Sequence, residues 1–159
     1  MWVLLAYRVP RDPSTPRIAI WRRLKRLGVA QLGDGLVALP ADARTQEQLE
    51  WVADQVAEAG GSSTLWRAEL LSRSQERELI KRLAAARAEE YAAITARALA
   101  ALEASQRESV RAMRGLRREL RQVQRRDFFP PPVREQAVAA VKRLAATLAS
   151  TKAPGVTSS

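Results

Sequence analysis

Residues 29–40 read VAQLGDGLVALP, and this short stretch decides the fold. Two apolar runs, Val29–Leu32 and Leu36–Leu39, flank the turn residues Gly33-Asp34-Gly35. Apolar runs that flank a tight turn rich in Gly and Asp predict a β-hairpin. Pro40 is expected to end the second strand, because proline lacks the N–H group that a β-ladder needs.

Helix and strand patterns flank the hairpin on both sides. The predicted elements are a strand over residues 2–9, a helix over residues 17–27, a helix over residues 45–58 and a strand over residues 63–70. The order of strand, helix, strand, strand, helix and strand is the ferredoxin-like βαββαβ arrangement. We therefore predict an α+β fold whose ferredoxin-like domain covers residues 1–71.

Capping residues and apolar spacing define the two helices of this domain. Ser14 or Thr15 is the expected N-cap of the first helix, because a hydroxyl oxygen can accept a hydrogen bond from a free amide there. A capping box of Thr45 and Gln48 is expected to open the second helix. The face of the first helix that is predicted to point inward holds Ile18, Trp21 and Leu24. We expect all four tryptophans to lie in the core or in interfaces rather than to stack on bases, namely Trp2, Trp21, Trp51 and Trp66.

The character of the chain changes after residue 71. Residues 74–104 are rich in Ala, Glu and Arg and contain neither Pro nor Gly, which favours one long helix. A break near Ser105 precedes an arginine-rich helix, and a last helix is expected over residues 133–149. The predicted all-helical extension therefore covers residues 72–149, and residues 150–159 form a polar tail that we expect to be disordered.

Six arginines recur along one side of the arginine-rich helix, at spacings of 4, 3, 4, 3 and 4 residues. Residues three and four apart are neighbours on a helix surface, so these side chains form one ridge, here called the arginine stripe. An apolar face with the same period is expected to pack inward. The arginine stripe consists of Arg107, Arg111, Arg114, Arg118, Arg121 and Arg125, and the apolar face consists of Val110, Met113, Leu116, Leu120 and Val123.

The net charge of the chain is +10, and much of the excess lies in this helix. Residues 105–126 contain eight basic and two acidic side chains. Positive charge concentrated on one element is the electrostatic footprint of a nucleic-acid-binding protein, so DNA is the predicted partner and the stripe is predicted to contact its phosphates. Two alternatives stay open. In one, the chain is a non-enzymatic helical adaptor or oligomerisation protein that binds an acidic partner; in the other, Glu89, Glu90 and Glu103 neutralise the stripe internally.

The first domain contains two further groups of basic residues. The first helix carries a cluster that is predicted to assist DNA binding, with an ordinary solvent-exposed face as the alternative: Arg22, Arg23, Lys25 and Arg26. The loop before that helix would offer amide N–H groups to an oxyanion, with an ordinary helix cap as the alternative. The candidate oxyanion-binding residues are Arg8, Arg11, Ser14, Thr15 and Arg17.

Composition excludes several classes of function. The chain has no Cys and no His, which removes disulfides, thiolate nucleophiles, Cys/His zinc sites and imidazole acid–base chemistry. Since no pair of carboxylates is spaced for metal or acid–base work, we expect no enzyme activity, catalytic residue or metal. We also expect no cofactor, with chromate or another oxyanion as a candidate effector. No apolar run reaches the roughly 18 residues of a membrane span, so we expect a cytoplasmic protein without a membrane partner.

Several short stretches also resemble one family. They include Trp2-Val3-Leu4-Leu5, Tyr7-Arg8-Val9-Pro10, the run from Pro13 to Arg17, the run from Trp21 to Gly28, Asp34-Gly35-Leu36, Leu39-Pro40, Glu50-Trp51 and Asp127-Phe128-Phe129-Pro130. In these the chain resembles the chromate-resistance regulators of the ChrB type, a family associated with transcriptional control of chromate-efflux operons. The resemblance implies a transcriptional regulator. A homodimer is expected because palindromic operators favour two-fold readers, with Val138, Val141 and Leu148 or the long helix as its seam.

Overall fold

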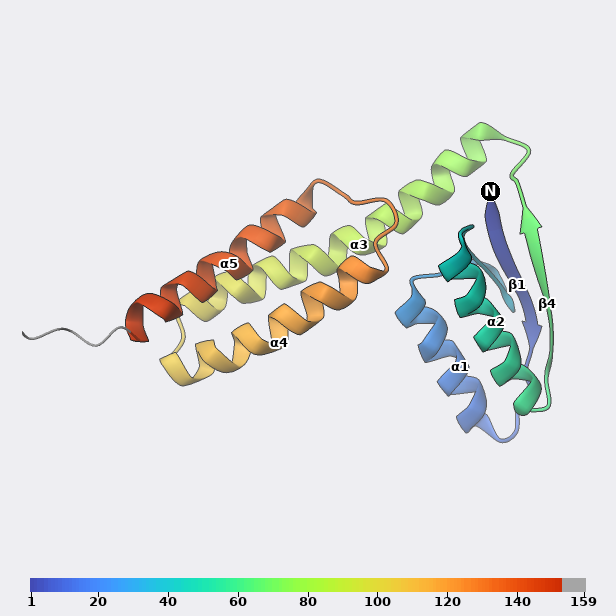
Figure 1. Ribbon diagram of the computed structural model, residues 1–159, viewed down its shortest axis with the longest axis horizontal. Helices are drawn as coiled ribbons and strands as arrows, with labels where there is room; N and C mark the ends of the chain where they lie inside the picture. Colours follow the sequence, from blue (N-terminus) through green and yellow to red (C-terminus); the bar gives the residue numbers. More distant parts are fainter. Residues whose placement is uncertain (153–159) are drawn as a thin grey trace, which may run out of the picture. The chain divides into compact units, whose positions relative to one another are not determined.

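The structure is a computed structural model that describes residues 1–152. The described chain divides into two compact units, the first Met1–Leu83 and the second beginning at Ala84. Figure 1 shows the elements in chain order. They are β1 (Trp2–Arg8), α1 (Ser14–Leu27), β2 (Ala30–Gly33), β3 (Leu36–Pro40), α2 (Ala43–Glu58), β4 (Ser62–Ala68), α3 (Arg73–Leu102), α4 (Gln106–Arg125) and α5 (Val133–Lys152).

The first unit contains a four-stranded antiparallel sheet with the strand order β2-β3-β1-β4. In the register of this sheet, Leu4 of β1 lies between Ala38 of β3 and Trp66 of β4. The predicted sequence of six elements is present, with β1 and β3 at the centre of the sheet. The predicted α+β fold with a helical extension is therefore confirmed.

Helices α1 and α2 lie side by side on one face of this sheet (Figure 1). Apolar side chains from both layers fill the space between them, because burial of apolar surface is the main stabilising term of such a core. The first turns of α3 add Leu79 and Leu83 to the buried residues, and Glu76 accepts a hydrogen bond from the indole of Trp2 at 3.1 Å. The fully buried side chains of the helix-covered layer include Leu5, Ile20, Leu39, Leu49, Val52 and Val56.

The β2–β3 hairpin depends on one glycine. Gly35 has a φ of 70°, in the left-handed region that an L side chain rarely adopts. A Cβ atom at this position would collide with the carbonyl oxygen of Tyr7, whose own N–H donates to the Gly35 carbonyl at 2.8 Å. Gly35 therefore lets the hairpin turn approach the backbone of β1.

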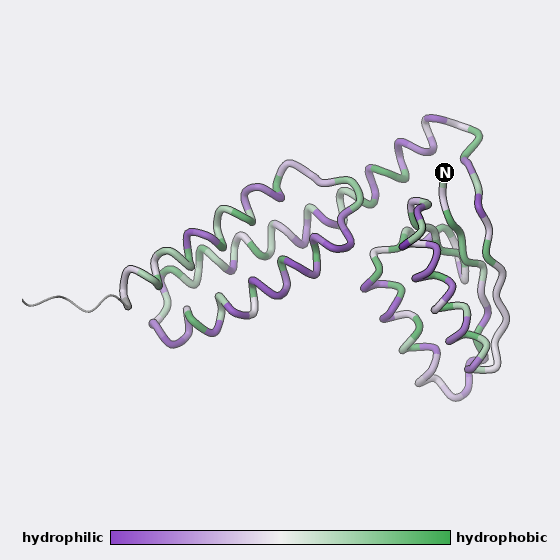
Figure 2. The backbone as a smooth tube through the Cα atoms, viewed as in Figure 1, coloured by the Kyte–Doolittle hydropathy of each residue, from purple (hydrophilic) through white to green (hydrophobic). Residues whose placement is uncertain are grey.

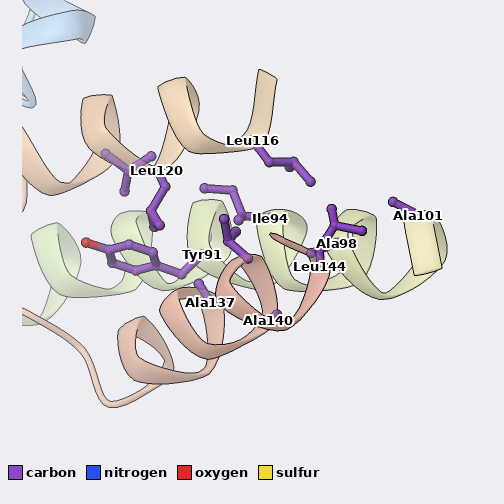
Figure 3. Packing of buried hydrophobic residues seen from close by; sticks show 11 residues of the cluster. Tyr91, Ile94, Ala98, Ala101, Leu116, Leu120, Ala137, Ala140 and Leu144 are labelled. Atoms are coloured by element: carbon purple, nitrogen blue, oxygen red, sulfur yellow. The ribbon is translucent and has the colours of Figure 1, made fainter. Parts of the chain in front are cut away.

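The second unit is a bundle of α4, α5 and most of α3 around one apolar cluster (Figure 3). Figure 2 shows hydrophilic residues recurring along α4, whose apolar side contributes Leu116, Leu120 and Val123 to the cluster. Met113 packs against this cluster, and Val110 is half-buried. The apolar face predicted for the arginine-rich helix is therefore the face that packs inward.

The starts of α1 and α2 differ from the predicted caps. α1 begins at Ser14, and Pro13 occupies the N-cap position without a side-chain hydrogen bond, so the predicted cap by Ser14 or Thr15 is wrong. α2 follows Asp42, whose carboxylate accepts from the Thr45 N–H at 2.8 Å. Thr45 is the partner of Asp42 in that capping box rather than the cap. Its hydroxyl is buried and donates to the Pro40 carbonyl at 2.6 Å.

The inward face of α1 also differs from the prediction. Ile20 and Leu24 are buried, whereas Ile18 is 42% exposed and Trp21 is 47% exposed. Ile18, Trp21 and Leu24 are three residues apart, whereas Ile20 and Leu24 are four apart; both spacings are helical, and packing against the sheet selects Ile20. Of the four tryptophans, Trp2 lies in the core as expected. The other three are exposed, which corrects the expectation of buried rings: Trp21, Trp51 and Trp66.

The last helix is longer than predicted. α5 continues to Lys152, and the hydroxyls of Ser150 and Thr151 donate to the carbonyls of Ala146 and Thr147, four residues earlier. These local hydrogen bonds are compatible with a last helical turn, so the start of the tail expected over residues 150–159 is helical. The rest of that expected tail, residues 153–159, lies outside the described residues.

Candidate functional site

The structure places all six arginines of the stripe on the exposed side of α4. The helix starts with a capping box in which Ser105 and Glu108 exchange hydrogen bonds, and it runs unbroken to Arg125. Since Leu116, Leu120 and Val123 are buried against α3 and α5, packing fixes which side of α4 points outward. The stripe is therefore brought together along one ridge, as the spacing predicts.

The acidic residues of α4 do not neutralise the stripe. Glu119 accepts from Arg97 of α3 at 2.7 Å. Glu108 is engaged with the backbone N–H and hydroxyl of Ser105, at 3.2 and 2.9 Å. Both carboxylates of the helix thus have partners outside the stripe.

The preceding helix does not neutralise the stripe either. Glu90 pairs with Arg87 at 2.8 Å and with Arg126 at 2.6 Å, and neither arginine belongs to the stripe. Within residues 1–152, five arginines of the stripe form no ion pair with Glu89, Glu103 or any other carboxylate. These five are Arg107, Arg111, Arg114, Arg118 and Arg121.

The second basic cluster is only partly available on α1. Arg22, Lys25 and Arg26 are exposed, whereas Arg23 is half-buried and donates to Gln55 of α2 at 3.0 Å. A groove of about 700 Å³ between α1 and α2 is lined by Arg22, Arg23 and Arg26 together with acidic residues of α2. The acidic residues in its lining, Asp54 and Glu58, lower the positive potential of this cluster.

A separate cavity of about 710 Å³ lies where the end of β1, the side of α1 and the β2–β3 hairpin meet. Here the structure brings together Arg8, Arg11 and Arg17 of the predicted oxyanion group. Ser14 and Thr15, which form the first turn of α1, do not line this cavity. Arg22 of the second basic cluster also lines the cavity, a placement that its position in the sequence does not indicate.

A polar network at one end of the helical bundle was also not anticipated. The hydroxyl of buried Tyr91 donates to Asp127 at 2.7 Å, beside the Arg87–Glu90–Arg126 ion pairs. Burial, and next the hydrogen bond to Asp127, raise the pKa of Tyr91 above its ordinary value, and burial lowers the pKa of Arg87. Asp127 belongs to a stretch that the sequence singles out, but no sequence pattern indicates that it contacts Tyr91, which lies 36 residues earlier.

The apolar residues suggested for a dimer seam lie within the bundle of one chain. Val141 is buried, and Val138 and Leu148 pack against the same cluster as Leu116 and Ile94. The apolar side of α5 thus closes the bundle of its own chain, with Val138 and Leu148 only partly buried, and the long helix α3 stays the other predicted seam. Among the described residues, no helix is both long enough and apolar enough to cross a membrane.

Comparison with known proteins identifies one family. The family model described as Protein ChrB, N-terminal, matches residues 17–153, a range that starts inside α1 and includes all of α4. Protein ChrB of Cupriavidus metallidurans is 27% identical over 133 residues, which cover 81% of this chain and 40% of that relative. The chain thus spans less than half the length of this curated relative. No solved structure matches the chain.

The family match and the fold agree with each other. The match extends from α1 through the helical bundle, so its range includes the arginine stripe of α4 and the part of the cavity lining that follows residue 17, whereas Arg8 and Arg11 precede it. A match over most of the chain shows that the protein belongs to the family described as Protein ChrB, N-terminal.

Proposed function

We propose that this chain is a DNA-binding transcriptional regulator of a chromate-resistance type operon and that it contacts DNA phosphates through the arginine stripe of α4. The family supports the regulatory part of the proposal, since the chain belongs with ChrB-type proteins. The DNA contact is argued from the surface of α4. Arg22, Lys25 and Arg26 of α1 are proposed as additional phosphate contacts, because they too are exposed.

The observation that carries the proposal is that most of the stripe stays positively charged and exposed within the described residues. Five of its arginines have no carboxylate partner among residues 1–152, and both acidic residues of α4 are engaged elsewhere. Like charges three and four residues apart repel by a few tenths of a kcal/mol per pair, so the repulsion among these five arginines has a cost that a bound anion removes.

The length of the stripe favours a polymer of negative charge over a small anion. At about 1.5 Å per residue, the ridge from Arg107 to Arg125 is about 27 Å long. A small anion would contact one or two of these side chains, whereas a DNA backbone presents phosphates along the whole ridge. Arginine also suits this role, because its planar guanidinium can bond a phosphate with two N–H groups.

A gel-shift titration with duplex DNA at about 50 mM salt tests the proposal. We expect the wild-type protein to shift the duplex, and we expect R114Q/R118Q to weaken binding about tenfold, which corresponds to about 1.4 kcal/mol. The matched control is K142Q/R143Q, which removes the same charge from exposed residues of α5 in the same unit. The control is expected to bind as the wild type does.

Two results would contradict the proposal. One is the absence of any shift at low salt. The other is an equal loss of affinity in R114Q/R118Q and K142Q/R143Q, which would mean that only total charge matters. A protein that assembles with an acidic protein partner and purifies without nucleic acid would support the adaptor function instead, and the ratio of absorbance at 260 and 280 nm distinguishes the two.

We further propose that the protein is not an enzyme. A nuclease of this fold would show metal-dependent cleavage that is lost in Asp12→Asn, and we expect no cleavage of duplex DNA by the wild type with Mg²⁺ or Mn²⁺.

A cytoplasmic homodimer stays part of the proposal, with its seam outside the apolar face of α5. Sedimentation analysis with and without duplex DNA would measure the oligomeric state.

A further inference from the structure

The cavity beside α1 has walls of two different kinds. Four arginines line it, Arg8, Arg11, Arg17 and Arg22, against a single carboxylate, Asp34. The ring of Trp21 forms part of the same lining and is 47% exposed. Such a combination of a strongly positive wall and an exposed aromatic ring is suited to a ligand that has both negative charge and a planar ring.

The arginines of this cavity are not committed elsewhere in the described chain. None of Arg8, Arg11, Arg17 or Arg22 forms an ion pair within residues 1–152. With one carboxylate in the lining, the wall keeps an excess of positive charge. That excess matches a phosphate ester, which carries up to two negative charges at neutral pH, better than it matches a single carboxylate.

The indole of Trp21 is held in place from outside the cavity. The Lys25 ammonium lies 4.3 Å from the ring centroid, and Lys25 does not line the cavity. A cation over an aromatic ring is attracted by the electrons of the ring face, so this contact orients the indole. Because Trp21 lines the cavity and is 47% exposed, its ring is accessible to another flat group, and stacking between rings is favourable.

The size of the cavity fits a ligand that contains a ring better than it fits a bare oxyanion. A volume of about 710 Å³ lies within the range of about 300–1,000 Å³ typical of sites for small organic ligands. A tetrahedral oxyanion occupies the space of only a few waters at about 30 Å³ each, so it would leave most of the cavity to solvent. A nucleoside monophosphate occupies more of the space and uses both kinds of wall.

We infer that this cavity is a binding site for a nucleoside monophosphate, with the phosphate at the arginine wall and the base against Trp21. Asp34 supplies an acceptor for the hydroxyl groups of the sugar. The hairpin turn holds Asp34 next to β1, because the carbonyl of neighbouring Gly35 accepts a hydrogen bond from the Tyr7 N–H at 2.8 Å. The site does not depend on the arginine stripe, because no residue of α4 lines the cavity; it shares only Arg22 with the additional phosphate contacts proposed on α1.

The test is calorimetric titration of the full chain with the four ribonucleoside monophosphates, and separately with orthophosphate, in the absence of DNA. We expect at least one nucleotide to bind, and orthophosphate to bind at least tenfold more weakly. Trp21→Ala and R8Q/R17Q are each expected to weaken nucleotide binding at least tenfold. Trp21→Phe keeps an aromatic ring and is expected to restore most of the affinity lost in Trp21→Ala.

Trp51→Ala and Trp66→Ala are the matched controls, since both rings are exposed and neither lines this cavity. Both are expected to bind as the wild type does. The inference is overturned if no nucleotide binds at millimolar concentration, if orthophosphate binds as tightly as the nucleotides, or if Trp21→Ala leaves the affinity unchanged. The inference is also overturned if a short DNA duplex displaces the nucleotide and if Trp21→Ala weakens the binding of that duplex. The ring of Trp21 would then belong to a DNA-binding surface.

Discussion

At the scale of single residues, two neighbouring glycines of the hairpin have different roles. Gly35 combines a φ of 70° with a close approach to the Tyr7 carbonyl, whereas a Cβ on Gly33 would meet nothing within 4 Å. We expect Gly35→Ala to lower the free energy of unfolding by about 1–3 kcal/mol, because it adds backbone strain and a collision. Equilibrium denaturation in urea measures this change.

Gly33→Ala is the control for that prediction. It lies in the same hairpin, has no positive φ and is expected to change the free energy of unfolding by less than about 0.5 kcal/mol. Equal effects of the two substitutions would show that the left-handed turn at Gly35 is not needed.

The raised pKa of Tyr91 makes the free energy of unfolding depend on pH. Because burial and the bond to Asp127 raise the pKa of Tyr91 in the folded chain, the unfolded chain releases this proton first as the pH rises past about 10. The contribution of Tyr91 is therefore complete below about pH 10 and is lost at higher pH. We expect the urea midpoint to fall between about pH 8 and about pH 11 in the wild type, and to fall less in Tyr91→Phe. Circular dichroism of the helices would follow the transition, and an equal fall in both proteins would contradict this account.

Residue types and spacing predicted some of these details and not others. The turn at Gly33-Asp34-Gly35 and the exposed side of the arginine stripe follow from local pattern, because both depend on residues close together in the sequence. The contact between Tyr91 and Asp127 does not, since the two residues meet only after α3, α4 and α5 have packed. Trp21 shows the same limit, because its spacing allowed a buried ring and the packing of Ile20 decided otherwise.

At the scale of elements, α4 contains a residue that does not favour helix. Gly115 lies in the middle of α4, and a Cβ there would meet nothing within 4 Å. Alanine has a higher helix propensity than glycine by about 1 kcal/mol, so we expect Gly115→Ala to raise the free energy of unfolding by up to that amount. Thermal denaturation would measure the gain. A lower melting temperature in Gly115→Ala would show that the position needs the freedom of glycine.

The order of the elements was predictable, while the ends of helices were less so. Apolar periodicity and the turn residues gave every strand and helix in its correct place, including the break before α4 at Ser105. The helix caps required a choice among neighbouring polar residues, and Asp42 proved to be the cap where Thr45 was expected. A carboxylate near a helix N-terminus is also favoured by the helix dipole, which is the physical reason for the difference.

At the scale of the whole molecule, two compact units contain two distinct basic surfaces. The first unit has the arginine-lined cavity beside α1, and the second has the arginine stripe on α4. The sequence indicated the stripe because a single helix holds all of it. It did not indicate that Arg22 joins the cavity, since that placement depends on how α1 packs beside the hairpin.

The central claim is that the arginine stripe contacts DNA phosphates, and the dependence of binding on salt tests it most directly. Each phosphate contact contributes about 0.9 to the slope of log K against log salt concentration, so R114Q/R118Q should reduce the slope by roughly 1.8. K142Q/R143Q removes an equal charge from exposed positions of α5 and should leave the slope unchanged. Equal slopes for the wild type and R114Q/R118Q would contradict the claim.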